Sequence, residues 1–223
     1  MNPLLDSLLP PGIRTAASTI ANHVEDLLPP ERPFIATAVA SRQREFATGR
    51  VLARQLLADL GHPDFPLLRD EDRIPRWPEG IVGSISHTGS ICVAAVGRES
   101  QYSGVGLDIE PDEPAESDIG RVVCRDAEHD WVAAATGDER GRRTRIVFSV
   151  KEAVYKAFYP RTREFWSFQD VLVSIDLEEG RYRAQLPESA GIAKVEGRVH
   201  RREGWIVAAL AVESGMGMAG VSA

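Results

Sequence analysis

The strongest constraint on the fold is an order of elements that occurs twice: one amphipathic helix, then strands joined by short turns. In the first half, apolar side chains recur at helical spacing over residues 36–60, and Gly61 supplies a stop. A β-hairpin pattern follows, with residues 88–90 as its turn. The strands predicted for this half are residues 81–87, 91–96 and 104–110.

The second half repeats the order less clearly. Residues 146–159 predict a helix that Pro160 closes. The strands predicted after it are residues 171–176, 181–186, 195–200 and 204–212. We therefore expect an α+β protein built as a pseudo-dimer of two similar halves, residues 1–110 and 111–223, each an antiparallel sheet packed with a long helix.

The composition is that of a folded globular protein, with 43% hydrophobic and 26% charged residues in a chain of 223. No Lys or Arg precedes Arg14, so a basic secretory leader is not expected. The longest apolar run, residues 205–212, is far shorter than the roughly 20 residues that span a bilayer. These features predict a cytoplasmic protein with no membrane partner. Cys92 and Cys124 lack CxxC spacing and are expected to be reduced, and the tail, residues 213–223, is expected to be frayed.

Charge is distributed unevenly along the chain. A net charge of −7 argues against a general nucleic-acid binder, whose affinity for phosphates needs a basic surface. Residues 32–54 nevertheless hold five Arg and one Glu, whereas residues 108–118 hold six acids and no base. This separation suits a polyanionic ligand that meets arginines at one end and a carboxylate-bound cation at the other. The alternative interpretation is that both charged segments are ordinary solvated surface and bind no ligand.

Two carboxylates share one face of the predicted strand 104–110. Strict alternation puts Asp108 and Glu110 opposite the apolar side chains, and two residues along a strand separate Cα atoms by roughly 6.6 Å. Both acids could therefore reach one hard cation such as Mg²⁺, with Gly106 leaving room for a ligand. The alternative is an exposed strand end that runs into a solvated acidic loop.

The helix predicted over residues 146–159 carries a third acid beside a lysine. Glu152 and Lys156 lie four residues apart, away from the apolar stripe, which is the spacing of an ordinary surface ion pair. The other interpretation is catalytic, with Glu152 as a metal ligand and base and Lys156 offsetting developing charge. Only three lysines occur in the chain, and Lys151 and Lys156 are two of them, which suggests a need for ammonium groups there.

Two hydroxyls and an imidazole lie at the end of the predicted strand 81–87. Ser84, Ser86 and His87 supply donors suited to a phosphate. A Ser/His nucleophile pair is less favoured, because no G-x-S-x-G elbow is present and neighbouring strand residues face opposite sides.

Taken together, three segments resemble the ordered motifs of the phosphopantetheinyl transferases: GSISH at residues 83–87, GVGLDIE at residues 104–110 and FSVKEAVYK at residues 148–156. The likeness is greatest to the siderophore-type subgroup that includes enterobactin synthetase component D and actinobacterial relatives. RIPRWP at residues 73–78 and the arginines of residues 42–50 also resemble that subgroup. The match spans roughly residues 42–160.

The resemblance implies an enzyme of the holo-acyl-carrier-protein synthase type. It would transfer 4′-phosphopantetheine from coenzyme A to a serine of an apo acyl or peptidyl carrier protein, releasing adenosine 3′,5′-bisphosphate. The pathway would be siderophore, polyketide, nonribosomal-peptide or fatty-acid synthesis, and the family fold is a pseudo-dimer with coenzyme A between the halves. The rival functions are another Mg²⁺-dependent nucleotide or pyrophosphate enzyme and a non-catalytic carrier-binding subunit.

Residue roles follow from the resemblance position by position. Asp108, Glu110 and Glu152 match ligands of Mg²⁺, with Mn²⁺ as the alternative ion, and the catalytic set is Glu152, Lys156 and Asp108. The residues matching coenzyme A contacts are Arg42, Arg50, Arg73, Ser86, His87, Lys151 and Lys156.

One further expectation concerns the carrier protein. Residues 140–145 are predicted as a loop before the metal-binding helix, and a flexible, solvated loop is the plain interpretation. The other hypothesis is that its arginines bind the acidic recognition helix of the carrier protein and raise the association rate. The four are Arg140, Arg142, Arg143 and Arg145. A monomer is expected.

Overall fold

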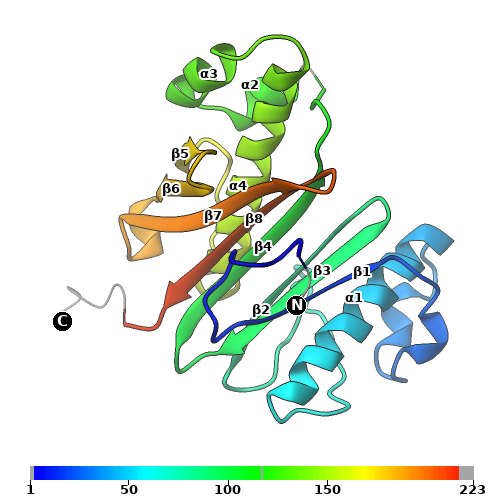
Figure 1. Ribbon diagram of the computed structural model, residues 1–223. Helices are drawn as coiled ribbons and strands as arrows, with labels where there is room; N and C mark the ends of the chain where they lie inside the picture. Colours follow the sequence, from blue (N-terminus) through cyan, green and yellow to red (C-terminus); the bar gives the residue numbers. More distant parts are fainter. Residues whose placement is uncertain (1–2, 117, 216–223) are drawn as a thin grey trace.

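The computed structural model describes residues 3–116 and 118–215 as an α+β protein with two antiparallel sheets (Figure 1). Most of the tail that was predicted to be frayed, residues 216–223, lies outside the described residues. The strands are β1 (Arg14–Thr19), β2 (Ile81–Thr88), β3 (Ile91–Arg98), β4 (Tyr102–Pro111), β5 (Leu172–Asp176), β6 (Arg181–Gln185), β7 (Lys194–Arg202) and β8 (Trp205–Glu213). The α-helices are α1 (Ala40–Asp59), α2 (Ile119–Val123), α3 (Asp126–Ala133) and α4 (Asp138–Thr162), with short 3₁₀ turns at Val24–Asp26, Arg32–Ile35 and Glu188–Ala190.

The strands form one sheet of three and one sheet of five. The first has the order β1-β3-β2, and the second has the order β4-β8-β7-β6-β5. All their pairings are antiparallel. β4 follows β3 in the chain, yet its hydrogen-bonded neighbour is β8, with Asp108 opposite Ala208. The last strand of the predicted N-terminal half thus completes the sheet of the C-terminal half, and the division at residue 110 stays a prediction.

The two sheets meet along the edges of β2 and β4, which run side by side (Figure 1). Serine hydroxyls join the two edges: Leu107 N donates to Ser84 Oγ at 3.1 Å, and Ile109 N donates to Ser86 Oγ at 3.4 Å. Ser84 Oγ in turn donates to Leu107 O at 3.4 Å. Three backbone groups on the edge of β4, both of Leu107 and the amide of Ile109, are therefore satisfied without a backbone ladder.

Each sheet packs against a long helix. α1 covers the three-stranded sheet, and α4 packs on β4 and β8 (Figure 1). Glycines allow α4 to approach β4 closely, because a Cβ at Gly106 would lie 1.8 Å from Ala153 O and one at Gly104 would lie 2.3 Å from Ala157 O. The expectation that Gly106 leaves room for a ligand is therefore wrong: the space is filled by the helix backbone.

The predicted elements are largely confirmed, with two corrections in α4. Pro160 lies inside this helix, which ends only at Thr162. Residues 140–145 are its first turns and not a loop, since Asp138 and Glu139 give the helix an acidic start that suits its dipole. β1, α2 and α3 were not predicted. Among the described residues, no helix is long and apolar enough to span a membrane.

Candidate active site

Asp108 lies at the centre of the predicted site, on the face of β4 that meets α4. The residue is 3% exposed, and Oδ1 accepts hydrogen bonds from Lys156 Nζ at 2.6 Å and Ser86 Oγ at 2.9 Å. The second oxygen, Oδ2, is buried and has no hydrogen-bond partner within the described part of the chain. Buried carboxylate oxygens are costly to leave unpaired, so this atom indicates a missing ligand.

The other two acids lie close enough for their charges to act on one another. Burial raises the pKa of Glu152, Lys156 opposes that shift, and the carboxylates of Asp108 and Glu110 add to it. Burial and Asp108 also raise the pKa of Glu110, which Arg145 Nη1 contacts at 3.0 Å. A strand and a helix distant in sequence thus bring three acids into one region.

The side chains as they stand do not form a metal cage. Within residues 3–116 and 118–215, no three His, Cys, Asp or Glu side chains lie together in a way that could hold an ion. Protein cations already contact two of the acids, since Lys156 pairs with Asp108 and Arg145 pairs with Glu110. The donor set still fits Mg²⁺, because it consists of carboxylates and includes the unpartnered Asp108 Oδ2.

His87 connects this centre to α1. Arg42 Nη1 lies 2.6 Å from His87 Nε2, and arginine can only donate, so Nε2 is the acceptor and the ring is neutral. Burial lowers the pKa of His87, and the charges of Arg42 and Lys156 also lower it, against the opposing charge of Glu45. The ring Nδ1 faces Glu45 Oε2 at 3.6 Å.

A group of arginines extends from His87 along α1. Arg50 is 5% exposed, donates from Nε to Leu67 O at 2.6 Å and lies over the ring of Phe46. Burial lowers its pKa to about 10, and the charges of Arg69 and Arg42 contribute. Arg69 lies over the ring of Phe34. Three guanidinium groups close enough to repel one another form a region suited to phosphate groups.

Arg73 reaches the site from another direction. It lines a cavity of about 260 Å³ together with Glu152 and Lys156, between the loop that precedes β2 and the C-terminal part of α4. Arg73 has a φ of +69°, in the left-handed region that non-glycine residues rarely adopt.

An apolar groove of about 590 Å³ opens on another side of Glu152. Its walls come from α2, from α4 and from the segment after α4, and Phe165 on its rim is 77% exposed. The aromatic residues that line it are Tyr155, Phe165, Trp166 and Phe168. Arg73, buried acids and an apolar groove thus lie around Glu152.

Family models match most of this chain. Residues 30–97 match the 4′-phosphopantetheinyl transferase N-terminal domain, and residues 104–210 match the 4′-phosphopantetheinyl transferase superfamily. The 4′-phosphopantetheinyl transferase Svp of Streptomyces mobaraensis is 36% identical over 204 residues, which cover 88% of this chain and 83% of that protein. The chain belongs to the 4′-phosphopantetheinyl transferase superfamily.

Two further relatives show how the transferase relates to the subgroup expected from its motifs. The 4′-phosphopantetheinyl transferase Npt of Nocardia iowensis is 32% identical over 179 residues, 79% of each chain. Enterobactin synthase component D of Salmonella typhi is 32% identical over 142 residues, 62% of this chain and 58% of that protein. The predicted family and enzyme class are thereby confirmed, including the likeness to siderophore-type members.

Two residues of the transferase that were predicted to contact coenzyme A are occupied elsewhere. Lys151 is 2% exposed, and its ammonium group donates to Glu128 Oε2, Val123 O and Phe168 O at 2.7–2.8 Å. These three bonds use all of its protons, so the structure contradicts the predicted phosphate contact. The hydroxyl of Ser86 is likewise occupied by Asp108 and Lys156, and it orients the carboxylate instead.

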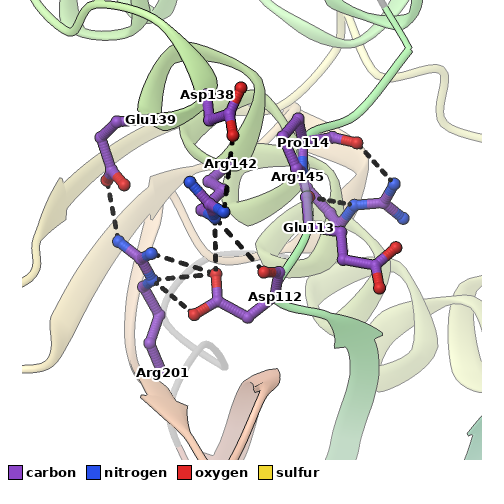
Figure 2. A network of polar contacts seen from close by, with 8 residues as sticks. All are labelled: Asp112, Glu113, Pro114, Asp138, Glu139, Arg142, Arg145 and Arg201. Atoms are coloured by element: carbon purple, nitrogen blue, oxygen red, sulfur yellow. Dashed lines mark hydrogen bonds and ion pairs between the residues drawn. The ribbon is translucent and has the colours of Figure 1, made fainter.

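The four arginines in the first turns of α4 all contact other groups of the protein. Figure 2 shows Arg142 directed at Asp112 and Asp138, and Arg145 directed at the backbone of the acidic loop. Arg201 of β7 contacts Asp112 and Glu139 in the same network (Figure 2). Arg143 donates to Trp131 O, and the exposed Arg140 donates to Ala135 O. These contacts attach the loop after β4 to α4, which positions Glu110.

Sequence reasoning missed several residues of the site. Arg69 had a recoverable signal, since it lies four residues before Arg73, next to the segment 73–78 that resembles the family. Glu128 and Arg201 gave no signal, because their partners lie 23 and 89 residues away in the chain.

Proposed function

We propose that this transferase moves the 4′-phosphopantetheine group of coenzyme A to a serine hydroxyl of an apo acyl or peptidyl carrier protein at the site around Asp108, Glu152 and Lys156. The product released would be adenosine 3′,5′-bisphosphate. Membership of the family establishes the class of enzyme. The observation that carries the assignment of the site is the buried, unpartnered Oδ2 of Asp108 beside Glu152 and Lys156.

The arginines are proposed to bind the phosphates of coenzyme A. Arg42, Arg50 and Arg69 form one cationic region beside His87, and Arg73 forms another on the cavity that Glu152 and Lys156 line. Guanidinium groups bind phosphate through paired hydrogen bonds, and two separate regions suit a donor with a diphosphate and a separate 3′-phosphate.

The pantetheine arm is proposed to lie in the apolar groove next to Glu152. The arm is mostly neutral and flexible, and an aromatic groove would hold it away from water. The exposed rim at Phe165 and Val122 leaves the groove open toward solvent, from which the serine of a carrier protein would approach.

Glu152 is proposed to accept the proton of the attacking serine. Burial raises the pKa of Glu152, which makes it a stronger base than an ordinary glutamate, and removal of the proton strengthens the nucleophile. Lys156, held by Asp108 and Ser86, offsets the charge that develops on the phosphate oxygens. Asp108, Glu110 and Glu152 would hold Mg²⁺, which would neutralise the diphosphate when bound. Mn²⁺ is the alternative ion.

The test is transfer to an apo carrier protein, followed as a gain in mass of one phosphopantetheine group. We expect Glu152→Gln to lower kcat by about 10²–10⁴-fold, as loss of a general base does, and Asp108→Asn to remove most activity. Chelation should stop the reaction, and added Mg²⁺ or Mn²⁺ should restore it. Glu196→Gln, an exposed acid in β7, is the matched control and should retain activity. Retention of most activity by Glu152→Gln would contradict the proposed base.

The predicted cytoplasmic location, monomeric state and pathway stay predictions. The same assay with carriers from fatty-acid, polyketide and nonribosomal-peptide systems would identify the preferred partner.

A further inference from the structure

The segment between α1 and β2 forms a small hairpin that carries two arginines of the site. Arg76 N donates to Leu68 O, Asp70 N donates to Ile74 O, and Arg69 pairs with Pro75 in an isolated bridge. Arg69 lies on one arm of this hairpin, residues 68–76, and Arg73 lies at its tip. The hairpin therefore determines where two guanidinium groups lie relative to the reacting groups.

The tip depends on Asp70. Asp70 Oδ1 accepts from Ile74 N at 2.9 Å, and Asp70 O accepts from Arg73 N at 3.1 Å. These bonds hold Arg73 at its positive φ, a conformation with a steric cost that the surroundings must offset.

A residue from the other half of the molecule holds this turn. Arg163 caps α4 in the left-handed conformation, and its Nη1 lies 2.5 Å from Asp70 Oδ2 and 3.5 Å from Asp72 Oδ2. One carboxylate oxygen of Asp70 thus accepts a hydrogen bond within the turn. The other pairs with Arg163 at the C-terminal end of α4, the helix that also carries Glu152 and Lys156. The Arg163 side chain is 52% exposed, so it takes no part in the apolar core.

We propose that Arg163 is a positioning residue for phosphopantetheine transfer: its ion pairs with Asp70 and Asp72 fix the hairpin to the C-terminal end of α4 and so hold Arg73 on the cavity that Glu152 and Lys156 line. This inference rests on the proposed function, in which Arg73 contacts a phosphate of coenzyme A. Arg163 itself would not contact the substrate. These ion pairs join the two halves of the molecule. Their loss should weaken the binding of coenzyme A and leave the rate of the transfer step unchanged.

The kinetic test is Arg163→Gln with coenzyme A as the varied substrate. Partly exposed ion pairs are individually weak, so we expect KM for coenzyme A to rise about three- to fivefold while kcat and KM for the carrier change less than about twofold. Arg163→Lys keeps the charge and should restore most of the affinity. Arg183→Gln breaks a surface ion pair of 2.6 Å between β6 and β7 and should leave every constant unchanged.

Two further measurements separate positioning from a general structural effect. In an Arg73→Ala background, Arg163→Gln should add little to KM, because the residue that it positions is gone. In the ligand-free protein, Arg163→Gln should speed hydrogen exchange at the amides of Arg73 and Ile74, which both bond to Asp70.

An unchanged KM in an active Arg163→Gln enzyme would overturn the inference and leave the proposed function intact. Equal increases in KM with and without Arg73 would also overturn it, since Arg163 would then act by another route. A wild-type protein that fails to modify any carrier would overturn both.

Discussion

Lys151 and Lys156 lie five residues apart, about 1.4 turns, on the same helix, yet burial gives them different roles. Lys156 is partly exposed and pairs with Asp108 at the site, whereas Lys151 is enclosed by Glu128 and two backbone carbonyls. Burial lowers the pKa of Lys151, and the bond to Glu128 opposes that shift. Glu128 also accepts from Arg125 N and Val173 N, so the pair connects α3, α4 and β5. Lys151 therefore stabilises the fold around Glu152.

We predict that Lys151→Ala destabilises the protein by about 3–5 kcal/mol, because it leaves the Glu128 carboxylate buried without its counter-charge. Urea unfolding measures the loss. Lys151→Met combined with Glu128→Gln should recover part of it, since no lone charge then remains. Lys194→Ala, at an exposed position of β7, is the control. A stable Lys151→Ala protein with weakened coenzyme A binding would contradict this role and restore the phosphate contact.

Residues of the site could be predicted where the sequence pattern determines which face of a strand or helix they occupy. They could not be predicted where the role depends on a contact with a residue distant in the chain. Alternation along β4 predicts that Asp108 and Glu110 share a face, and helical spacing places Glu152 and Lys156 on another surface than the core stripe. Nothing local distinguishes Lys151 from a ligand-binding lysine, because Glu128 is 23 residues away. The predicted roles of the acids and of Arg42, Arg50 and Arg73 stay predictions.

At the scale of elements, the contact between α4 and β4 determines how closely the helix acids can approach the strand acids. Gly104 and Gly106 lie on the face of β4 toward α4, where any Cβ would meet a helix carbonyl. Because these glycines have no side chains, the helix can approach the strand, and Lys156 Nζ lies 2.6 Å from Asp108 Oδ1. The glycines of the motif thus act through packing, because they let α4 approach β4 closely.

We predict that Gly106→Ala destabilises the protein by about 3 kcal/mol or more and removes transfer activity, because α4 must move away from β4 to admit the methyl group. Thermal unfolding and the carrier mass assay measure the two effects. Gly120→Ala is the control, since its added Cβ would meet only Thr144 at an ordinary 3.7 Å and alanine favours the helix α2. A Gly106→Ala enzyme with full stability would show that the close approach is not required.

Elements with strong periodicity were predicted best. The β2–β3 hairpin follows from alternation around a Gly89 turn, and the strands of the second half follow in the same way. The start of α4 was missed because its first turns carry arginines in place of an apolar stripe, and those arginines are satisfied by the acidic loop shown in Figure 2. β1 was missed because its sequence, RTAAST, holds no large apolar residue, and because its partner β3 lies far away in the chain.

For the whole molecule, the doubled order of elements predicts two halves, but it cannot predict which sheet receives β4. That choice depends on pairing with β8, about a hundred residues later in the chain. The result places one edge strand of each sheet, β2 and β4, side by side. Both strands carry residues of the site, so the geometry of the active centre depends on how firmly these two edges are joined.

The serine hydroxyls of β2 join the two edges, and Ser84 is the serine whose hydroxyl bonds to Leu107 and not to Asp108 or Lys156. Its hydroxyl accepts from Leu107 N and donates to Leu107 O, and Leu107 immediately precedes Asp108. We predict that Ser84→Ala lowers the free energy of unfolding by about 1–3 kcal/mol, because two buried backbone groups lose their partner. Transfer should also slow, since Asp108 would no longer be held in register with Ser86. Urea unfolding and the carrier mass assay measure these effects, with Ser174→Ala on the exposed face of β5 as the control. If Ser84→Ala unfolded at the same urea concentration as the wild type, apolar packing between the sheets, such as that of Val93 of β3 with Val105 and Leu107 of β4, would have to hold them together without the hydroxyl.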